Sequence, residues 1–490
     1  MKDITHLLHQ RRRAGILLHP TSLPGPLPRG LVCHDAYRFI EFLSQSGMTV
    51  WQMLPLGPTH TDGSPYQSLS AHACETSLIS LDWLQDRGLL DEVIEVADFN
   101  LHQQYLKTAW SNFQKQKTSS LFKSFKSFIK SHADWLEDFA IFMAIREQQG
   151  DQVWTKWPAA LRDRKKASII KVKSELSDSI DFHQFGQFIF FQQWHDLKQY
   201  AKKHDVLLFG DLPIYVSHDS ADVWVNRDLF LLDKDGEATI VAGVPPDYFS
   251  ETGQRWGNPQ YNWDAMQKNN FVWWQQRLHT QLELFDLVRV DHFRGFQAYW
   301  EIEADEETAI NGRWVEAPGE ALLTSLQTYF HQLPLVAEDL GIITDEVTAL
   351  REQFDLPGMK ILQFAFDNNP KNAYLPHNHT FNSVVYTGTH DNDTTLSWYQ
   401  HLNESEREAI YAYLGVNREE PMAWPLIRAA FASTSCLAMF PLQDVLALGE
   451  GHRMNTPGTT EGNWQWRFDW QQIPNDLASQ LGELSQRYDR

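Results

Sequence analysis

The stretch Leu287-Val288-Arg289-Val290-Asp291 is a short run rich in β-branched residues that ends in a carboxylate. Two other runs share this form, Leu335-Val336-Ala337-Glu338-Asp339 and Val384-Val385-Tyr386-Thr387-Gly388-Thr389-His390-Asp391. Apolar runs of this length, bounded by polar segments, are typical of buried parallel strands. Carboxylates at the C-terminal ends of several such strands meet around one mouth of a barrel, where enzymes of that architecture place their reactive groups.

Eight strand candidates of this kind can be counted along the chain, and helical patterns separate most of them. The candidates are Ala14–His19, Thr49–Leu54, Val206–Leu212, Leu287–Asp291, Leu333–Glu338, Met359–Phe364, Ser383–Thr389 and Ser435–Phe440. Alternating strands and helices predict a parallel sheet. Eight repeats favour a closed (β/α)8 barrel over an open doubly wound sheet, so the expected fold class is an α/β TIM barrel.

The spacing of the candidates predicts two large insertions in a single catalytic domain of residues 1–490. About 150 residues separate the second and third strands. Because this exceeds an ordinary βα loop, we expect a mostly helical subdomain at 57–205. A second insertion at 217–285 contains a hairpin signal around 229–236, and we expect it to form loops of the substrate cleft.

Charge and composition restrict the partners of this chain. Its 63 acidic and 42 basic residues give a formal charge of −21, which argues against nucleic acid and anionic membranes as partners. No stretch approaches the roughly 18 apolar residues of a membrane helix, and the polar start lacks a signal-peptide core. We therefore expect a cytoplasmic protein, and the sequence leaves its oligomeric state open.

The three cysteines, Cys33, Cys74 and Cys436, show no metal-ligand spacing and are too few for a disulfide framework. Cys33 and Cys74 can pair in principle, but we expect three reduced thiols. The chain also has 19 Trp residues, and flat aromatic faces suit the apolar faces of sugars. Plain core packing is the alternative for more than half of them.

Arg289 and Asp291 project to the same side of their strand, because side chains alternate along it. An Arg beside a carboxylate keeps it ionised and oriented, as a nucleophile requires. A structural ion pair at a strand end is an equal alternative. Asp211 ends the strand before it and can bond Arg289 rather than substrate.

Glu338 ends an apolar strand, where burial or a neighbouring carboxylate can keep it protonated as a general acid. Its neighbour Asp339 points to the opposite face, so the two do not share a role. The alternative is that both begin a solvated loop. His390 and Asp391 can bind adjacent hydroxyls of a sugar, although a polar turn explains such a cluster equally well.

Metal and cofactor motifs are missing from the sequence. The run Asp233-Lys234-Asp235-Gly236 resembles the start of a calcium loop, but Ala242 occupies the position that needs a bidentate Glu. The chain has no His-Glu-x-x-His, paired Cys-x-x-Cys, P-loop or dinucleotide fingerprint. We expect no metal and no cofactor.

Taken together, these segments resemble the amylomaltase family, the 4-α-glucanotransferases or disproportionating enzymes related to the α-amylase clan. The resemblance runs nearly end to end and is carried by the following ordered stretches: Gly15–Pro26, Ser64–Ser68, Gly210–Val216, Asp219–Trp224, Gly243–Tyr248, Gly253–Pro259, Arg289–Gly295, Ala337–Gly341, His390–Thr394 and Arg453–Arg467. One departure is visible at 71–76, where the family commonly has a smaller turn. The chain has no room for the β-sandwich that follows the barrel in amylases.

The resemblance implies Asp291 as nucleophile, Glu338 as general acid/base and Asp391 as transition-state stabiliser. It also implies substrate-binding residues, which are Tyr66, Asp211, Gln254, Trp256, Arg289, His390 and Asn463. Gln254 and Trp256 would sit on a mobile loop over the acceptor side, and Asn463 at the rim.

The activity implied by the resemblance is transfer of a segment of a 1,4-α-glucan to the 4-hydroxyl of another glucan or glucose, by a retaining double displacement. Maltooligosaccharides and related α-glucans would be the partners. The acids alone fit an α-glucan hydrolase equally well. A catalytically silent glucan-binding protein is the alternative from another class.

Overall fold

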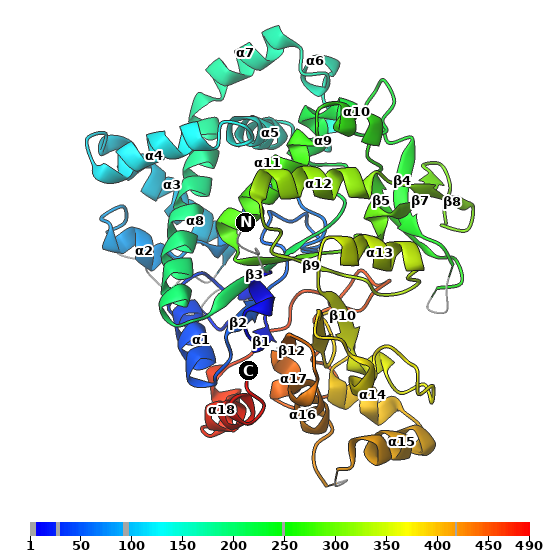
Figure 1. The fold of residues 1–490 in the computed structure, drawn as a ribbon. Coiled ribbons are helices and arrows are strands. Elements are labelled where there is room, and N and C mark those ends of the chain that lie inside the picture. The colour runs from blue at the N-terminus through cyan, green and yellow to red at the C-terminus, as the bar shows by residue number, and fades with distance from the viewer. Residues whose placement is uncertain (1–5, 26–29, 92–97, 247–249, 417–418) are drawn as a thin grey trace.

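The centre of the protein is a barrel of eight parallel strands (Figure 1). The computed structural model describes residues 6–25, 30–91, 98–246, 250–416 and 419–490. The barrel strands are β1 (Arg13–Leu17), β2 (Val50–Gln52), β3 (Leu207–Leu212), β6 (Leu287–Val290), β9 (Leu335–Ala337), β10 (Gly358–Ile361), β11 (Ser383–Tyr386) and β12 (Leu437–Pro441). All eight predicted strands are present, and the predicted barrel is confirmed.

The strands follow the order β10-β11-β12-β1-β2-β3-β6-β9, with every neighbouring pair parallel. The amide of Ala337 donates to the carbonyl of Pro357 (2.9 Å), just before β10, and this bond closes the ring. Closure brings β9 and β10 beside each other. The ends of all eight strands therefore surround one mouth.

Period-two alternation decides which side chains enter the barrel. Leu287, Phe209 and Val336 belong to one buried interior cluster, together with residues of the other strands. Side chains two and four residues further along a strand point to the same face as the interior residue. Arg289, Asp291, Asp211 and Glu338 therefore follow apolar interior residues towards the mouth.

Helices fill most of the chain between the strands (Figure 1). Between β1 and β2 lies α1 (His34–Gln45). Between β2 and β3 lie α2 (Leu81–Asp86), α3 (Phe99–Lys115), α4 (Ser120–Ser131), α5 (Leu136–Gln148), α6 (Ala159–Arg162), α7 (Lys166–Glu175) and α8 (Ser177–Lys203). Later helices are α9 (Ala221–Val225), α10 (Trp263–Lys268), α11 (Val272–Leu284), α12 (Gly319–Phe330), α13 (Asp345–Gln353), α14 (Thr395–His401), α15 (Glu404–Leu414), α16 (Ala423–Ala432), α17 (Leu442–Val445) and α18 (Leu477–Arg487). No helix of the described residues is long and apolar enough to cross a membrane.

A second sheet lies beside the barrel, at the right of Figure 1. It is antiparallel, in the order β5-β4-β7-β8, and its strands are β4 (Ile240–Val244), β5 (Gln254–Pro259), β7 (Ala298–Glu303) and β8 (Gly312–Glu316). The strands β7 and β8 were not among those predicted from the sequence. Both follow β6, so the loop after Asp291 supplies half of this sheet. The second sheet therefore joins two segments that are separate along the chain.

The predicted loop that carries Gln254 and Trp256 is instead the edge strand β5. It pairs with β4, and the register of the pair shifts between Val241 and Gly243 of β4. Gly253 precedes it with a φ of +67°, in the left-handed region where glycine is favoured. In this segment a polar residue follows a glycine at two places, Gln254 after Gly253 and Asn258 after Gly257. Such a pattern does not indicate a strand, and only pairing with β4 makes it one.

Candidate active site

Arg289 links two strands and two carboxylates at the mouth of the barrel. Its strand neighbour across β3 is Asp211, and Nη1 of Arg289 donates to both carboxylate oxygens of Asp211 at 2.8 Å. Its Nη2 forms an ion pair with Oδ1 of Asp291 at 2.9 Å. The side chains of Asp211 and Arg289 are only 1% and 6% exposed, whereas that of Asp291 is 30% exposed. Asp291 is thus the more exposed of the two carboxylates that pair with Arg289.

Electrostatics hold Arg289 in its charged form. Burial alone would lower the pKa of Arg289, but the carboxylates of Asp211 and Asp291 outweigh burial and raise that pKa well above its ordinary value. A permanent positive charge therefore lies beside the Asp291 carboxylate. An adjacent cation can orient a carboxylate for nucleophilic attack.

Glu338 ends β9, next to β6, and its two oxygens have separate backbone donors. The amide of His292 donates to Oε2 (2.6 Å), and the amide of Leu340 donates to Oε1 (3.0 Å). His292 reaches this position with a φ of +53°, which is unusual for a residue other than glycine. The carboxyl group of Glu338 is therefore fixed in orientation by backbone on both sides.

The environment of Glu338 favours its protonated form. Burial raises the pKa of Glu338 to about 7, Arg289 opposes this shift, and the negative charge of Asp291 adds to it. Two neighbouring carboxyl groups therefore differ, with one beside a fixed cation and the other poised near neutral pH. Such a difference is typical of an acid and a nucleophile that share one reaction.

Asp339 does not share the role of Glu338, in agreement with the alternation of the strand. Its Oδ1 accepts from the amide of Met359 (2.7 Å), and its Oδ2 pairs with Arg351 (3.2 Å) outside the barrel. Gly358 makes room for this carboxylate, because a Cβ there would lie 2.3 Å from Oδ2 of Asp339. Asp339 is a structural carboxylate that joins β9 to β10.

Tyr66 and His390 form the next layer of the site. The hydroxyl of Tyr66 donates to Oδ2 of Asp211 (2.7 Å), and Nε2 of His390 lies 2.9 Å from the same hydroxyl. Since Tyr66 has only one proton, His390 is the donor and carries its proton on Nε2. The two rings stack with centroids 5.3 Å apart. His390 Nε2 is also 3.3 Å from Oδ2 of Asp391, so this layer connects Asp211 to Asp391.

Trp256 packs against His292, which follows β6. Its ring meets the ring of His292 edge-on, with centroids 4.9 Å apart, and its Nε1 donates to Oε1 of Gln254 (3.1 Å). The imidazole of His292 is neutral, since burial lowers the pKa of His292 to about 4. The Trp256 ring of the second sheet thus lies against His292, the residue that follows Asp291. The exposed side-chain amide of Gln254 lies beside that ring.

Asn463 does not contact the acids. Its amide is used inside its own loop, where Oδ1 accepts from the amide of Thr456 (2.9 Å) and Nδ2 donates to Thr459. Its neighbour Trp464 is the residue that reaches the site, with its ring 5.9 Å from that of Tyr66 and 6.1 Å from that of His390. Asn463 was predicted from the sequence as a substrate-binding residue, whereas Trp464, one position later, was not.

Two further residues of the same segment were missed. Asn455 donates through Nδ2 to Oδ1 of Asp391 (2.6 Å), and Arg453 donates through Nη2 to the main-chain carbonyl of Asp391 (2.8 Å). Both lie in the stretch Arg453–Arg467 that carried the family resemblance. Its unusual density of polar and turn-forming residues was the available signal.

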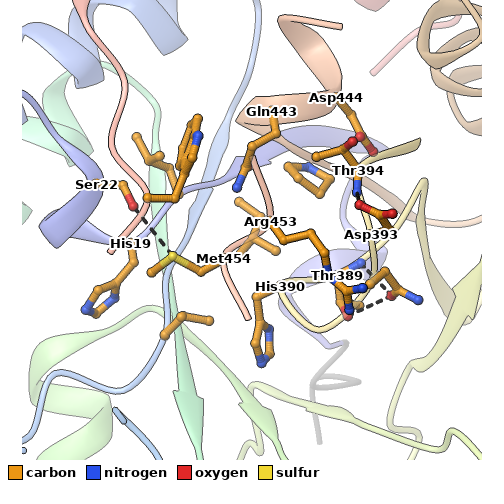
Figure 2. Close-up of a pocket in the computed structure, with 16 residues that line it drawn as sticks. His19, Ser22, Thr389, His390, Asp393, Thr394, Gln443, Asp444, Arg453 and Met454 are labelled. Carbon is orange, nitrogen blue, oxygen red and sulfur yellow. Dashed lines mark hydrogen bonds between the residues drawn. The ribbon is translucent and has the colours of Figure 1, made fainter. Parts of the chain in front are cut away.

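A small cavity of about 30 Å³ lies behind His390 (Figure 2). It is lined by residues from the first strand, from the 389–394 loop and from the 453–466 segment. Figure 2 shows Met454 beside Ser22 and the Arg453 side chain reaching towards the loop of Thr389 and His390. Among the described residues, no group of three or more His, Cys, Asp or Glu is arranged to hold a metal ion.

The fold and these acids define a class. A (β/α)8 barrel with paired carboxyl groups in unlike environments at the C-terminal mouth is the architecture of enzymes that act on glycosidic bonds. A profile of the 4-alpha-glucanotransferase family matches residues 18–472. The chain belongs to the 4-alpha-glucanotransferase family.

Individual relatives agree with this assignment over nearly the whole chain. The 4-alpha-glucanotransferase of Thermus thermophilus is 47% identical over 487 residues, which cover 96% of this chain and 97% of the relative. The chloroplastic/amyloplastic 4-alpha-glucanotransferase of Arabidopsis thaliana is 41% identical, over 94% of this chain and 82% of the relative. The amylomaltase from Streptococcus agalactiae, solved in complex with acarbose, superposes with a TM-score of 0.94 at 36% identity, over 98% of this chain and 100% of that one.

The buried Arg289–Asp211 pair yields a prediction about stability. Arg289→Met leaves the Asp211 carboxylate buried without its cation, which we expect to lower the free energy of unfolding by about 3–5 kcal/mol. Unfolding in urea, followed by tryptophan fluorescence, measures this loss. The double variant Arg289→Met/Asp211→Asn removes both charges and should recover most of it. A single variant as stable as the parent would contradict the pairing.

Proposed function

We propose that this chain transfers a segment of a 1,4-α-glucan to the 4-hydroxyl of another glucan or of glucose by a retaining double displacement. Asp291 is the nucleophile, Glu338 the general acid and base, and Asp391 the stabiliser of the transition state. The observation that carries the proposal is the unlike environment of two adjacent acids. Asp291 has a fixed cation 2.9 Å away, whereas burial raises the pKa of Glu338 to about 7.

In the first step the protonated carboxyl of Glu338 gives its proton to the glycosidic oxygen. A carboxylate oxygen of Asp291 attacks the anomeric carbon, and the bond from that carbon to the glycosidic oxygen breaks. The leaving glucan departs with a new 4-hydroxyl, and the donor sugar is held as an ester of Asp291. Positive charge develops on the sugar ring in the transition state, where a nearby carboxylate such as Asp391 stabilises it.

In the second step the 4-hydroxyl of an acceptor attacks the same carbon. Its proton passes to the Glu338 carboxylate, and the ester bond to Asp291 breaks, which restores both acids and the original anomeric configuration. Water performs the same attack in a hydrolase. Transfer therefore depends on how well the acceptor side binds sugar and excludes water while the ester waits.

The remaining predicted residues fit three roles in this scheme. His390 and Tyr66 present polar edges at the sugar that is cleaved. Arg289 holds Asp291, and Asp211 supports Arg289 and Tyr66 from below, since its side chain is only 1% exposed. The acceptor-side residues are Gln254 and Trp256 on β5, with Asn463 at the rim.

The wider setting also belongs to the proposal. Maltooligosaccharides and related α-glucans are the proposed partners, with support from the names of the relatives. The segments 57–205 and 217–285 are proposed as a helical subdomain and as walls of the cleft. A cytoplasmic location is supported by the three cysteines, which are all free thiols.

The first prediction for this reaction concerns Asp291. With maltotriose as the only sugar, the parent should form glucose together with longer chains, as chromatography of the products shows. Asp291→Asn should abolish these products, because the amide cannot form the ester, while maltotriose binding by calorimetry stays nearly unchanged. Asp264→Asn, an exposed position on α10, is the matched control.

Each other outcome of this assay has a meaning. Turnover retained by Asp291→Asn would refute its assignment as nucleophile. Steady release of reducing ends without longer products from the parent would indicate an α-glucan hydrolase. No product at all from the parent would indicate a silent glucan-binding protein.

The second prediction concerns pH. The first step needs protonated Glu338, and burial raises its pKa to about 7, so kcat/KM for maltotriose should fall as pH rises through about 7. With α-maltosyl fluoride as donor the leaving fluoride needs no proton, and the fall should disappear. A profile that is flat across neutral pH with maltotriose, or an identical fall with both donors, would contradict the role of Glu338.

The third prediction concerns the acceptor side. Trp256→Ala removes the ring that packs edge-on against His292 beside Asp291. Water should then reach the ester more often, so the share of hydrolysis among the maltotriose products should rise. Trp314→Ala, on β8 of the same sheet, controls for loss of an aromatic residue from that sheet. An unchanged ratio of hydrolysis to transfer in Trp256→Ala would refute the role of this residue.

A further inference from the structure

A segment near the end of the chain is bound along the 390–391 backbone. We call residues 453–456 the clamp segment. The amide of Asn455 donates to the carbonyl of His390 (3.2 Å), and Nη2 of Arg453 donates to the carbonyl of Asp391 (2.8 Å). Two successive carbonyls of the site are thus held by the clamp segment. One of these bonds joins two main-chain groups and the other comes from the Arg453 side chain, and together they fix the position of the clamp segment relative to Asp391.

The Asn455 side chain adds a bond to the carboxylate itself. Its Nδ2 donates to Oδ1 of Asp391 at 2.6 Å, and His390 Nε2 lies 3.3 Å from the other oxygen. Asn455 therefore supplies the hydrogen bond to this carboxylate, because the Nε2 proton of His390 is used on the Tyr66 hydroxyl.

Packing does not provide this orientation. The side chain of Asp391 is 45% exposed, whereas the buried carboxylate of Asp211 is 1% exposed. A half-exposed Asp has free rotation about its side-chain bonds unless hydrogen bonds restrict it. The hydrogen bond from Asn455 is accordingly the main restraint on the direction of this carboxylate.

The charge of the donors matters as well. The cation of the clamp segment, Arg453, bonds the Asp391 main chain, whereas the carboxylate receives the neutral amide of Asn455. A neutral donor stabilises the ionised carboxylate without cancelling its charge. The full negative charge remains available to the positive sugar ring of the transition state.

The clamp segment is itself anchored from both sides. The amide of Trp464 donates to the carbonyl of Met454 (2.8 Å), and the amide of Thr456 donates to the side chain of Asn463 (2.9 Å). Met454 is buried, and its sulfur lies next to Ser22 near β1 (Figure 2). Asn455 thus extends from a fixed backbone and can place its amide reproducibly.

We propose that Asn455 is a positioning residue, which holds the Asp391 carboxylate in the direction that transition-state stabilisation requires. The inference rests on the role proposed above for Asp391. Asn455 acts through that carboxylate and does not itself exchange protons or form bonds with the substrate.

Two substitutions at this position separate positioning from a merely structural role. Asn455→Ala removes the donor, and kcat for transfer from maltotriose should fall by about 10- to 100-fold with KM changed little. Asn455→Asp keeps the shape but places a second carboxylate against Oδ1 of Asp391, where two charges must share a proton or separate. Its kcat should fall by roughly 100-fold or more, below that of Asn455→Ala.

The order of the two variants is the decisive measurement. If Asn455 only fills space, the nearly isosteric Asn455→Asp is the milder change. The proposal is overturned if Asn455→Asp is as active as Asn455→Ala or more active, or if the loss lies wholly in KM. It is also overturned if α-maltosyl fluoride restores either variant, since that donor bypasses only the proton transfer from Glu338.

Controls keep the outcomes separate. Asn382→Asp makes the same change in another Asn–Asp pair, with Asp355 (3.2 Å), just before β11 at the opposite end of the barrel, and should leave kcat unchanged. Thermal unfolding of each variant checks that it is folded. Asp391→Asn is assayed in parallel. An active Asp391→Asn would show that the proposed role of Asp391 fails, whereas an inactive Asp391→Asn beside a fully active Asn455→Asp would refute this inference alone.

Discussion

The buried positive charge of Arg289 is the constraint on which the site depends. A guanidinium that is 6% exposed needs carboxylates around it, and the register of β3 against β6 supplies Asp211 directly opposite. One carboxylate is buried with it, and the second, Asp291, is partly exposed. The same charge opposes the burial that raises the pKa of Glu338 to about 7. One cation therefore acts on both candidate acids, as the ion-pair partner of Asp291 and as a charge that lowers the pKa of Glu338 against burial.

From that charge a chain of contacts crosses the mouth of the barrel. Asp211 accepts from Tyr66, Tyr66 meets His390, and His390 lies beside Asp391. These residues come from β3, from the loop after β2 and from the loop after β11. A disturbance at Arg289 is thus expected to reach Asp391 through this chain of contacts, while Asn455 bonds Asp391 from the clamp segment. The candidate acids and their neighbours form one connected network rather than three independent side chains.

The strands and their end residues were predictable because they depend on local patterns. Runs such as Leu287–Asp291 combine β-branched residues with a period of two, and this period assigns Arg289 and Asp291 to one face. The strand β8 was missed since its residues are mostly exposed, whereas β7 is largely buried but has Glu301 and Glu303 among its apolar residues. Trp256 was expected on a loop, because its strand exists only through pairing with β4. Asn455 was overlooked among the turn-forming residues around it.

What the sequence by itself determined is the eight-strand barrel, the inward face of each strand and the acids at the strand ends. Each of these follows from residues within a few positions of one another. Only the tertiary structure decided that Asp211 belongs to Arg289, that Trp464 rather than Asn463 reaches His390, and that Asn455 holds Asp391. These contacts join positions far apart in the chain. They exist because barrel closure and strand register place those segments side by side. A local sequence pattern does not specify which distant segments will meet.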